Sequence, residues 1–112
     1  MNPSDLYSDL LDALTNARSQ MISLPWQAAL DSGTSDQRVV ASNALIQVQS
    51  AIAALSTADL GDIAADMQAN EAGLSQATTN LNTALNDITK VQNILNAVGT
   101  LISNVAKIVP LL

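Results

Sequence analysis

Residues 60–109 of this chain read LGDIAADMQANEAGLSQATTNLNTALNDITKVQNILNAVGTLISNVAKIV. Apolar side chains recur in this stretch at alternating spacings of three and four, which is typical of a helix with one apolar stripe. With Leu60 as heptad position a, the a series is Leu60, Met67, Leu74, Leu81, Ile88, Leu95, Ile102 and Val109. The d series is Ile63, Asn70, Ala77, Ala84, Val91, Val98 and Val105. The pattern predicts a long C-terminal helix, over about residues 57–109, with coiled-coil-like packing.

The length of this helix raises a problem of burial. Unbroken, it would extend about 75 Å at ~1.5 Å per residue, over twice the reach of either preceding helix. Gly73 and Gly99 are candidate breaks, because glycine costs ~1 kcal/mol relative to alanine inside a helix. A break over residues 70–73 gives a compact four-helix bundle, whereas an intact helix needs a second chain to cover it. The heptad register passes through both glycines, which favours the intact or merely bent helix, and Asn70 fits either a register-setting position or a bend.

The first half of the chain predicts two shorter helices. One spans about residues 3–24 and begins with the capping sequence Asn2-Pro3. Residues 25–36, PWQAALDSGTSD, predict a connection, with one short turn of helix at Trp26 to Leu30 as an alternative. The second helix, about residues 37–55, is apolar on two sides, so it needs neighbours on both, within the chain or across a dimer. Its main stripe comprises Ala41, Leu45, Val48, Ile52 and Leu55, and its second stripe comprises Val39, Ile46 and Ala53. We therefore expect one all-α domain over residues 1–112, a three- or four-helix bundle.

Composition argues against several classes of function. The 112 residues include no Cys and no His, so thiolate nucleophiles, Ser-His pairs and Cys-ligated metals are excluded. A net charge of −6, with only four Lys and Arg residues, argues against a nucleic-acid partner. Two groups of acidic residues recur at helical spacing: Asp5, Asp9 and Asp12, and Asp59, Asp62 and Asp66. Both lie near predicted helix N-termini, where carboxylates are favoured. We therefore predict no catalytic, cofactor-binding or metal-binding residue, and no enzyme activity.

The apolar seam of the long helix is the predicted functional surface. We expect a non-enzymatic structural or protein-interaction module that self-associates as a homo-oligomer, or binds a helical protein partner, along this seam. The residues expected at the interface are Leu81, Ile88, Leu95, Val98, Ile102, Val105 and Val109. Trp26, the only tryptophan, is interpreted either as an exposed anchor for a partner or membrane, or as a plug at the end of the bundle.

A membrane-active protein is the alternative hypothesis. Residues 91–112 contain no acidic residue, and their apolar side is widened by Ile94, Leu101 and Ile108. Such a protein would be amphipathic, pore-forming or surface-coating, and would expose its uncharged C-terminal helix to a membrane. The scarcity of Lys and Arg on the polar side of this segment favours the interaction module.

The N-terminal sequence bears on localisation. It is acidic where a signal peptide needs a basic segment, and no uninterrupted apolar stretch reaches the ~20 residues of a spanning helix. We expect neither a cleavable signal peptide nor a transmembrane helix. The protein is then cytoplasmic, or exported without a leader.

Overall fold

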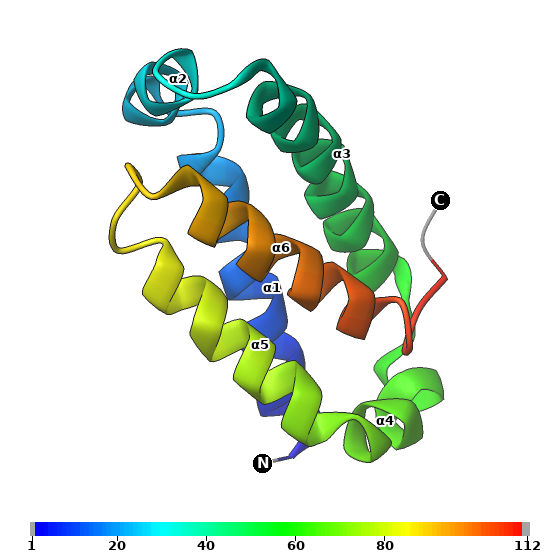
Figure 1. The fold of residues 1–112 in the computed structure, drawn as a ribbon. Helices are drawn as coiled ribbons and strands as arrows, with labels where there is room; N and C mark the ends of the chain where they lie inside the picture. Colours follow the sequence, from blue (N-terminus) through cyan, green and yellow to red (C-terminus); the bar gives the residue numbers. More distant parts are fainter. Residues whose placement is uncertain (1, 111–112) are drawn as a thin grey trace.

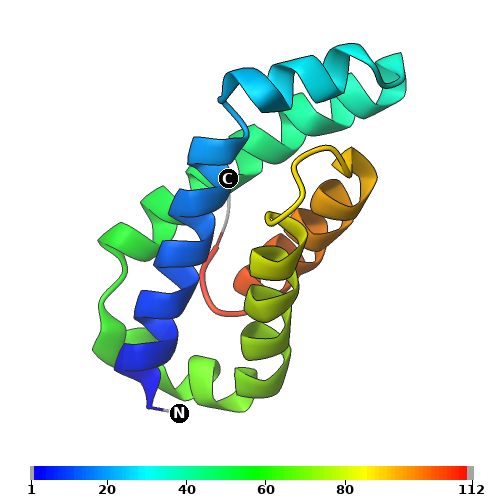
Figure 2. The ribbon, with the colours of Figure 1, turned by 90° about the vertical axis from the view of Figure 1, so that its left-hand side faces the viewer.

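The computed structural model describes residues 2–110, which form helices and no strand. The helices are α1 (Pro3–Gln20), α2 (Leu24–Asp31), α3 (Ser35–Thr57), α4 (Leu60–Ala69), α5 (Glu71–Ala84) and α6 (Val91–Val105). α5 packs against α6, α6 against α3, α3 against α1, and α1 against α5 (Figure 1). The short helices α2 and α4 lie at opposite ends of this arrangement (Figure 2). The predicted all-α class is confirmed.

The N-terminal half differs from the prediction mainly in its connection. Asn2 caps α1 as predicted, since its side-chain Oδ1 accepts a hydrogen bond from the Asp5 backbone N–H at 2.9 Å. The segment 25–36 is largely helical, because Ser23 caps a new helix, α2. Pro25 stands in the first turn of that helix, where proline loses no intrahelical hydrogen bond. The proline therefore begins a helix and does not end one.

The continuous helix predicted over residues 57–109 is wrong, because the structure divides this stretch into α4, α5 and α6. The first division falls at Asn70, inside the region predicted as a possible break. The Asn70 side-chain amide donates to the Asp66 carbonyl at 2.8 Å, and so competes with the backbone for that acceptor. Gly73 lies within α5, so it does not form the break.

The second division, at residues 85–90, was not predicted. There Asp87 Oδ1 accepts hydrogen bonds from the Thr89 backbone N–H at 3.1 Å and from the Thr89 hydroxyl at 2.6 Å. Asp and Thr side chains that bond locally in this way offer the backbone an alternative to the helical ladder. The chain reverses here, and α6 returns beside α5 (Figure 1).

The core is one hydrophobic cluster to which all six helices contribute. Because α6 folds back, apolar residues of both halves of the predicted long helix enter it. Its largest wholly buried side chains are Trp26, Leu6, Leu10, Leu14, Met21, Leu55, Met67, Leu74, Leu81, Ile94, Leu101 and Val48. Tyr7 ties α1 to the end of α3, since its hydroxyl donates to the Leu55 carbonyl at 2.6 Å.

α3 turns its smaller apolar residues inward and some of its larger ones outward. Its buried residues are Ala41, Ala44, Val48, Ala51 and Leu55. An alanine-rich face lets the helix backbone approach α1 and α6 closely. Val39 and Ile46, on the opposite side, keep 61% and 60% of their surface exposed. The second apolar stripe of this helix therefore stays largely exposed in the part of the chain that the structure describes.

The prediction that no segment could span a membrane is wrong for α3. This helix has 23 residues, and an 18-residue window within it has a mean hydropathy of 1.4, so by length and composition it is apolar enough to cross a bilayer. The reason is that its only charges, Asp36 and Arg38, lie in its first turn, while its other polar residues are uncharged. Signal sequences and the core helices of soluble proteins can be equally long and apolar. Only 28% of the 18-residue apolar window of α3 is buried, however.

We predict that Gly99→Ala raises the free energy of unfolding by about 0.5–1 kcal/mol, because alanine is the better helix former. Gly99 lies inside α6, and a Cβ added there would meet no atom within 4 Å. Gly73→Ala is the matched comparison, and we expect a smaller gain because its Cβ would lie 2.7 Å from the Asn104 Oδ1. Urea denaturation followed by circular dichroism measures both, and a destabilised Gly99→Ala would contradict the placement of this residue.

Candidate functional site

The residues predicted to form the interface seam lie inside the protein. Leu81, Leu95, Val98, Ile102, Val105 and Val109 are buried in the core, and Ile88 is half-buried against it. They come from α5, α6 and the turns that follow these helices. In this structure the seam is covered by other parts of the same chain, so it offers a partner no open surface.

Trp26 does not serve as an exposed anchor, because its side chain is only 1% exposed. It belongs to α2, where its backbone N–H donates to the capping Ser23 hydroxyl at 3.3 Å. α2 packs against α3 and α6 and lies at one end of the molecule (Figure 1). The side chain thus agrees with the alternative interpretation, a plug at one end of the core.

The two predicted acidic groups remain at the surface. Asp5, Asp9 and Asp12 are exposed along α1, and Asp59 and Asp62 are exposed at the start of α4. Within residues 2–110, the structure brings no three acidic side chains close enough to hold a metal ion.

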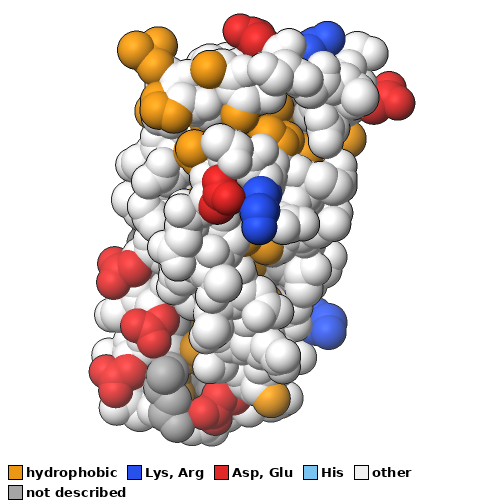
Figure 3. Space-filling model, turned by 60° about the vertical axis from the view of Figure 1, so that its left-hand side comes forward, with side chains coloured by type: hydrophobic (Ala, Val, Ile, Leu, Met, Phe, Trp, Pro, Cys, Tyr) orange, Lys and Arg blue, Asp and Glu red, His pale blue; other side chains and the backbone are white. Residues whose placement is uncertain are grey.

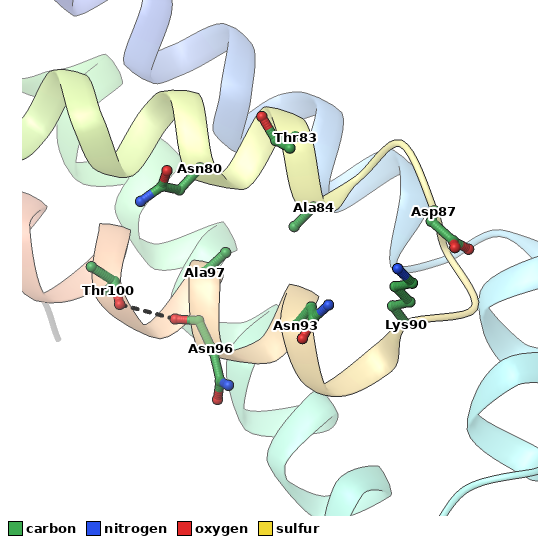
Figure 4. Close-up of a pocket in the computed structure, with 9 residues that line it drawn as sticks. All are labelled: Asn80, Thr83, Ala84, Asp87, Lys90, Asn93, Asn96, Ala97 and Thr100. Atoms are coloured by element: carbon green, nitrogen blue, oxygen red, sulfur yellow. Dashed lines mark hydrogen bonds between the residues drawn. The ribbon is translucent and has the colours of Figure 1, made fainter.

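A polar hollow of about 460 Å³ lies between α5 and α6 (Figure 4). It is lined by Asn80, Thr83, Ala84, Asp87, Lys90, Asn93, Asn96, Ala97 and Thr100. The Thr100 hydroxyl donates to the Asn96 carbonyl at 3.0 Å, which keeps it on its own helix. The remaining donors and acceptors are mostly neutral amides, which can hydrogen-bond a polar ligand but supply no nucleophile.

Asp87 and Lys90 are the charged residues of this hollow, and both are exposed. The pKa of Asp87 is held below its usual range, first by the hydrogen bond from the Thr89 hydroxyl, then by the Thr89 backbone N–H, with a smaller effect from Lys90. A carboxyl group with a lowered pKa is a weaker base than an ordinary one. General-base catalysis requires the opposite shift, towards neutral pH.

A second hollow, which we call the α3–α4 groove, lies at the C-terminal end of α3. It has a volume of about 680 Å³ and is bounded by the end of α3, the start of α4 and the turn after α6. Its lining consists of Ser50, Ala53, Ala54, Thr57, Ala58, Asp59, Asp62, Ile63, Ile108, Val109 and Pro110. Most of these side chains are apolar, and neither Lys nor Arg is among them.

The groove continues an apolar stripe along the exposed side of α3. Val39, Ile46 and Ala53 are spaced by seven residues, so they lie on one side of the helix. Ser50 and Thr57 share that side and line the groove. We call Val39, Ile46 and Ala53, together with the α3–α4 groove, the outer face of α3.

Other large apolar side chains, which do not belong to the outer face of α3, are also exposed. Val40 is 50% exposed, Ile22, in the turn before α2, is 60% exposed, and Leu24, the first residue of α2, is 84% exposed. On the side drawn in Figure 3, hydrophobic side chains gather toward the end of the molecule that holds α2. Several acidic side chains lie toward the opposite end (Figure 3).

One part of this surface has a signal in the sequence and the other part has none. The second stripe of the helix predicted over residues 37–55 indicated neighbours on two sides, within the chain or across a dimer, and its side chains Val39 and Ile46 are exposed in the structure. The groove carried no such signal, because it combines residues of α3 and α4 with residues 108–110. Comparisons with protein-family models, curated proteins and solved structures found no significant match. Functional inference therefore depends on the geometry of the chain itself.

We predict that Asp87 titrates at a lower pH than an ordinary aspartate, and that Thr89→Val moves its pKa partly back, because the hydroxyl donor is lost and the backbone donor remains. Since the folded pKa is lowered, the stabilisation from this group is present above the unfolded pKa and is lost as pH falls through the folded value. Carboxyl carbon chemical shifts measured by NMR follow the titration. Thr79→Val, on the exposed side of α5, is the control and should leave the pKa of Asp87 unchanged.

Proposed function

We propose that this chain is a non-enzymatic helical interaction module that binds a helical segment, of a partner protein or of another copy, on the outer face of α3. The observation that carries this proposal is the exposure of Val39 and Ile46, on one side of a helix, in a chain whose other large apolar residues are mostly buried. A row of apolar side chains at seven-residue spacing is the kind of ridge against which another helix packs.

The burial of the predicted seam moves the proposed docking surface from the C-terminal residues to α3. Using the seam would require α5 and α6 to separate, and each large side chain exposed would cost ~1.5–3 kcal/mol. Using the outer face of α3 requires no opening. We further propose that α1, α3, α5 and α6 form a four-helix bundle in which α5 and α6 pack as an antiparallel coiled-coil-like pair. The continuation of the a and d series through both helices supports that pairing.

The non-enzymatic part of the proposal is supported by the chemistry of the side chains. The sequence has no His and no Cys, which leaves carboxylates as the main candidates for acid–base work. The hydrogen bonds from Thr89 lower the pKa of Asp87, which makes this carboxylate a weaker base. Apart from two charged side chains in each, both hollows are lined by aliphatic groups, amides and hydroxyls, which favours binding of a ligand over catalysis. We likewise propose that the partner is not a nucleic acid, because of the net charge of −6.

Site-specific photo-crosslinking tests the proposed surface. With p-benzoylphenylalanine in place of Ile46, ultraviolet irradiation in extracts of the source cells should yield a discrete crosslinked product, because the residue would lie within the interface. The same probe in place of Ala65, exposed on α4 and outside the groove, should not yield that product. Adding Val39→Ser to the Ile46 probe should reduce the yield several-fold. Equal products from both probe positions would contradict the proposal.

A membrane-active protein is the second candidate, and the observation that favours it is the composition of α3. The window of mean hydropathy 1.4 lies in a helix without charge after Arg38, and most of that window is not buried. The exposed apolar side chains of Ile22 and Leu24 would add to contact with a bilayer surface. In this candidate α3, and not the C-terminal helix, is the segment that enters the membrane, because the apolar side of α6 is buried.

Flotation with vesicles distinguishes this candidate. If α3 enters membranes, the wild-type protein should float with phosphatidylcholine vesicles, with or without phosphatidylglycerol. Ile46→Asp should then reduce the floated fraction by at least about tenfold, since a carboxylate within the bilayer costs ~2.5–3.5 kcal/mol. Ala65→Asp, which adds the same charge on α4, should have little effect. A wild-type protein that stays at the bottom of the gradient with both vesicle types would exclude the candidate.

A further inference from the structure

We propose that the α3–α4 groove binds an apolar helical segment of another protein that carries a basic residue at one end. This inference rests on the proposed function, because the groove is part of the outer face of α3. It adds the chemical character of the partner and the position of its basic residue. Three observations support it. The floor of the groove is apolar, its rim is negatively charged, and a second copy of this chain fits it poorly.

The floor of the groove accepts apolar side chains. Methyl groups of Ala53, Ala54 and Ala58 form the α3 wall, and Ile63, Ile108 and Val109 complete the lining. The small side chains of that wall leave a volume of about 680 Å³, enough for several large aliphatic side chains of a docked helix. The Thr57 hydroxyl donates to the Ala53 carbonyl at 3.0 Å, so this polar group needs no partner from a ligand.

The rim of the groove is negatively charged. Asp59 and Asp62 line it, and no cation does. Asp59 is held in place because its Oδ1 accepts a hydrogen bond from the Gly61 backbone N–H at 2.8 Å, and a carboxylate has further lone pairs to offer a cation. The N-terminus of α4 supplies only about half a positive charge. Two carboxylates therefore dominate, and a Lys or Arg of the partner complements them.

A second copy of this chain fits this charge pattern less well. Each copy carries a net charge of −6, so two copies repel each other. The apolar pair Val39 and Val40 could fill the groove of another copy, but Asp36 lies in the same first turns of α3. Arg38, beside them, already donates to the carbonyls of Leu30 and Gly33, both at 3.1 Å. A different protein with a basic residue avoids this conflict.

The test uses a fluorescent synthetic peptide of about 14 residues, long enough to span about 21 Å as a helix. It has a Leu stripe on an Ala and Gln background and a pair of Lys at its C-terminal end. A matched peptide carries Glu in place of Lys. Fluorescence anisotropy with the full-length protein should give saturable binding of the Lys peptide. The Glu peptide should bind at least about tenfold more weakly, because its charges meet two carboxylates.

Two pairs of variants separate charge from shape. Asp59→Asn with Asp62→Asn should weaken binding of the Lys peptide by about three- to tenfold, the effect of losing two exposed ion pairs. Asn at position 59 retains the capping oxygen. Asp9→Asn with Asp12→Asn, which removes the same charge from α1, should change affinity by less than about twofold. Ala53→Gln should fill the groove and weaken binding at least about tenfold, whereas Ala65→Gln should not. Circular dichroism checks that every variant is folded.

The outcomes distinguish this inference from the proposed function. If Ala53→Gln abolishes binding while the Asp59 and Asp62 substitutions have no effect, the requirement for a basic residue is overturned and docking on α3 is retained. If the Lys peptide does not bind saturably, or if Ala53→Gln leaves its affinity unchanged, the groove is not the site and the inference fails. The crosslink from position 46 then decides the proposed function by itself.

Discussion

The burial of the apolar a and d residues of 60–109 is the constraint on which the rest of the structure depends. A straight helix would hold this surface along about 75 Å, far beyond what the N-terminal helices can cover. The chain resolves this by reversing at residues 85–90, so that α6 lies beside α5. Burying each large side chain, such as Leu81 or Leu101, contributes ~1.5–3 kcal/mol, whereas closing a short loop costs only a small amount of additional entropy. Reversal within one chain therefore competes well with assembly of several chains.

The position of α3 follows from that reversal. α5 and α6 form one side of the core and α1 another, and α3 packs against both α1 and α6. Its alanine-rich face allows close approach, and the bond from the Tyr7 hydroxyl to the Leu55 carbonyl at 2.6 Å fixes its C-terminal end against α1. That end is also the wall of the α3–α4 groove. The core contacts thus place both Ile46 and the groove on the outside of the molecule.

The sequence could predict the helical class, the capped start of α1 and a break close to Asn70, because each has a local signal. The turn at 85–90 had only a weak signal in Asn86 and Asp87, because the segment contains neither Gly nor Pro and Ile88 keeps the heptad register. The Thr89 hydroxyl donates a hydrogen bond to the Asp87 carboxylate in this turn. This local bond offsets the loss of helical hydrogen bonds only together with the burial of α6 in the core, which no local pattern predicts. α2 is longer than the single turn considered for residues 26–30, because Pro25 stands at the beginning of a helix here. The groove could not be predicted, since its three segments meet only in the folded chain.

The exposed residues of α3 are informative because folding does not require them. Burial in the core accounts for apolar residues such as Val48 and Leu55. Val39 and Ile46 contribute little to the core. Replacing exposed residues usually changes stability by less than about 0.5 kcal/mol. The same helix is uncharged after Arg38, although charged side chains on an exposed helix cost little and aid solubility. The proposed contact with another molecule would account for an apolar, uncharged surface on an otherwise acidic protein, and the carboxylates that line the groove would set the charge which that molecule should carry.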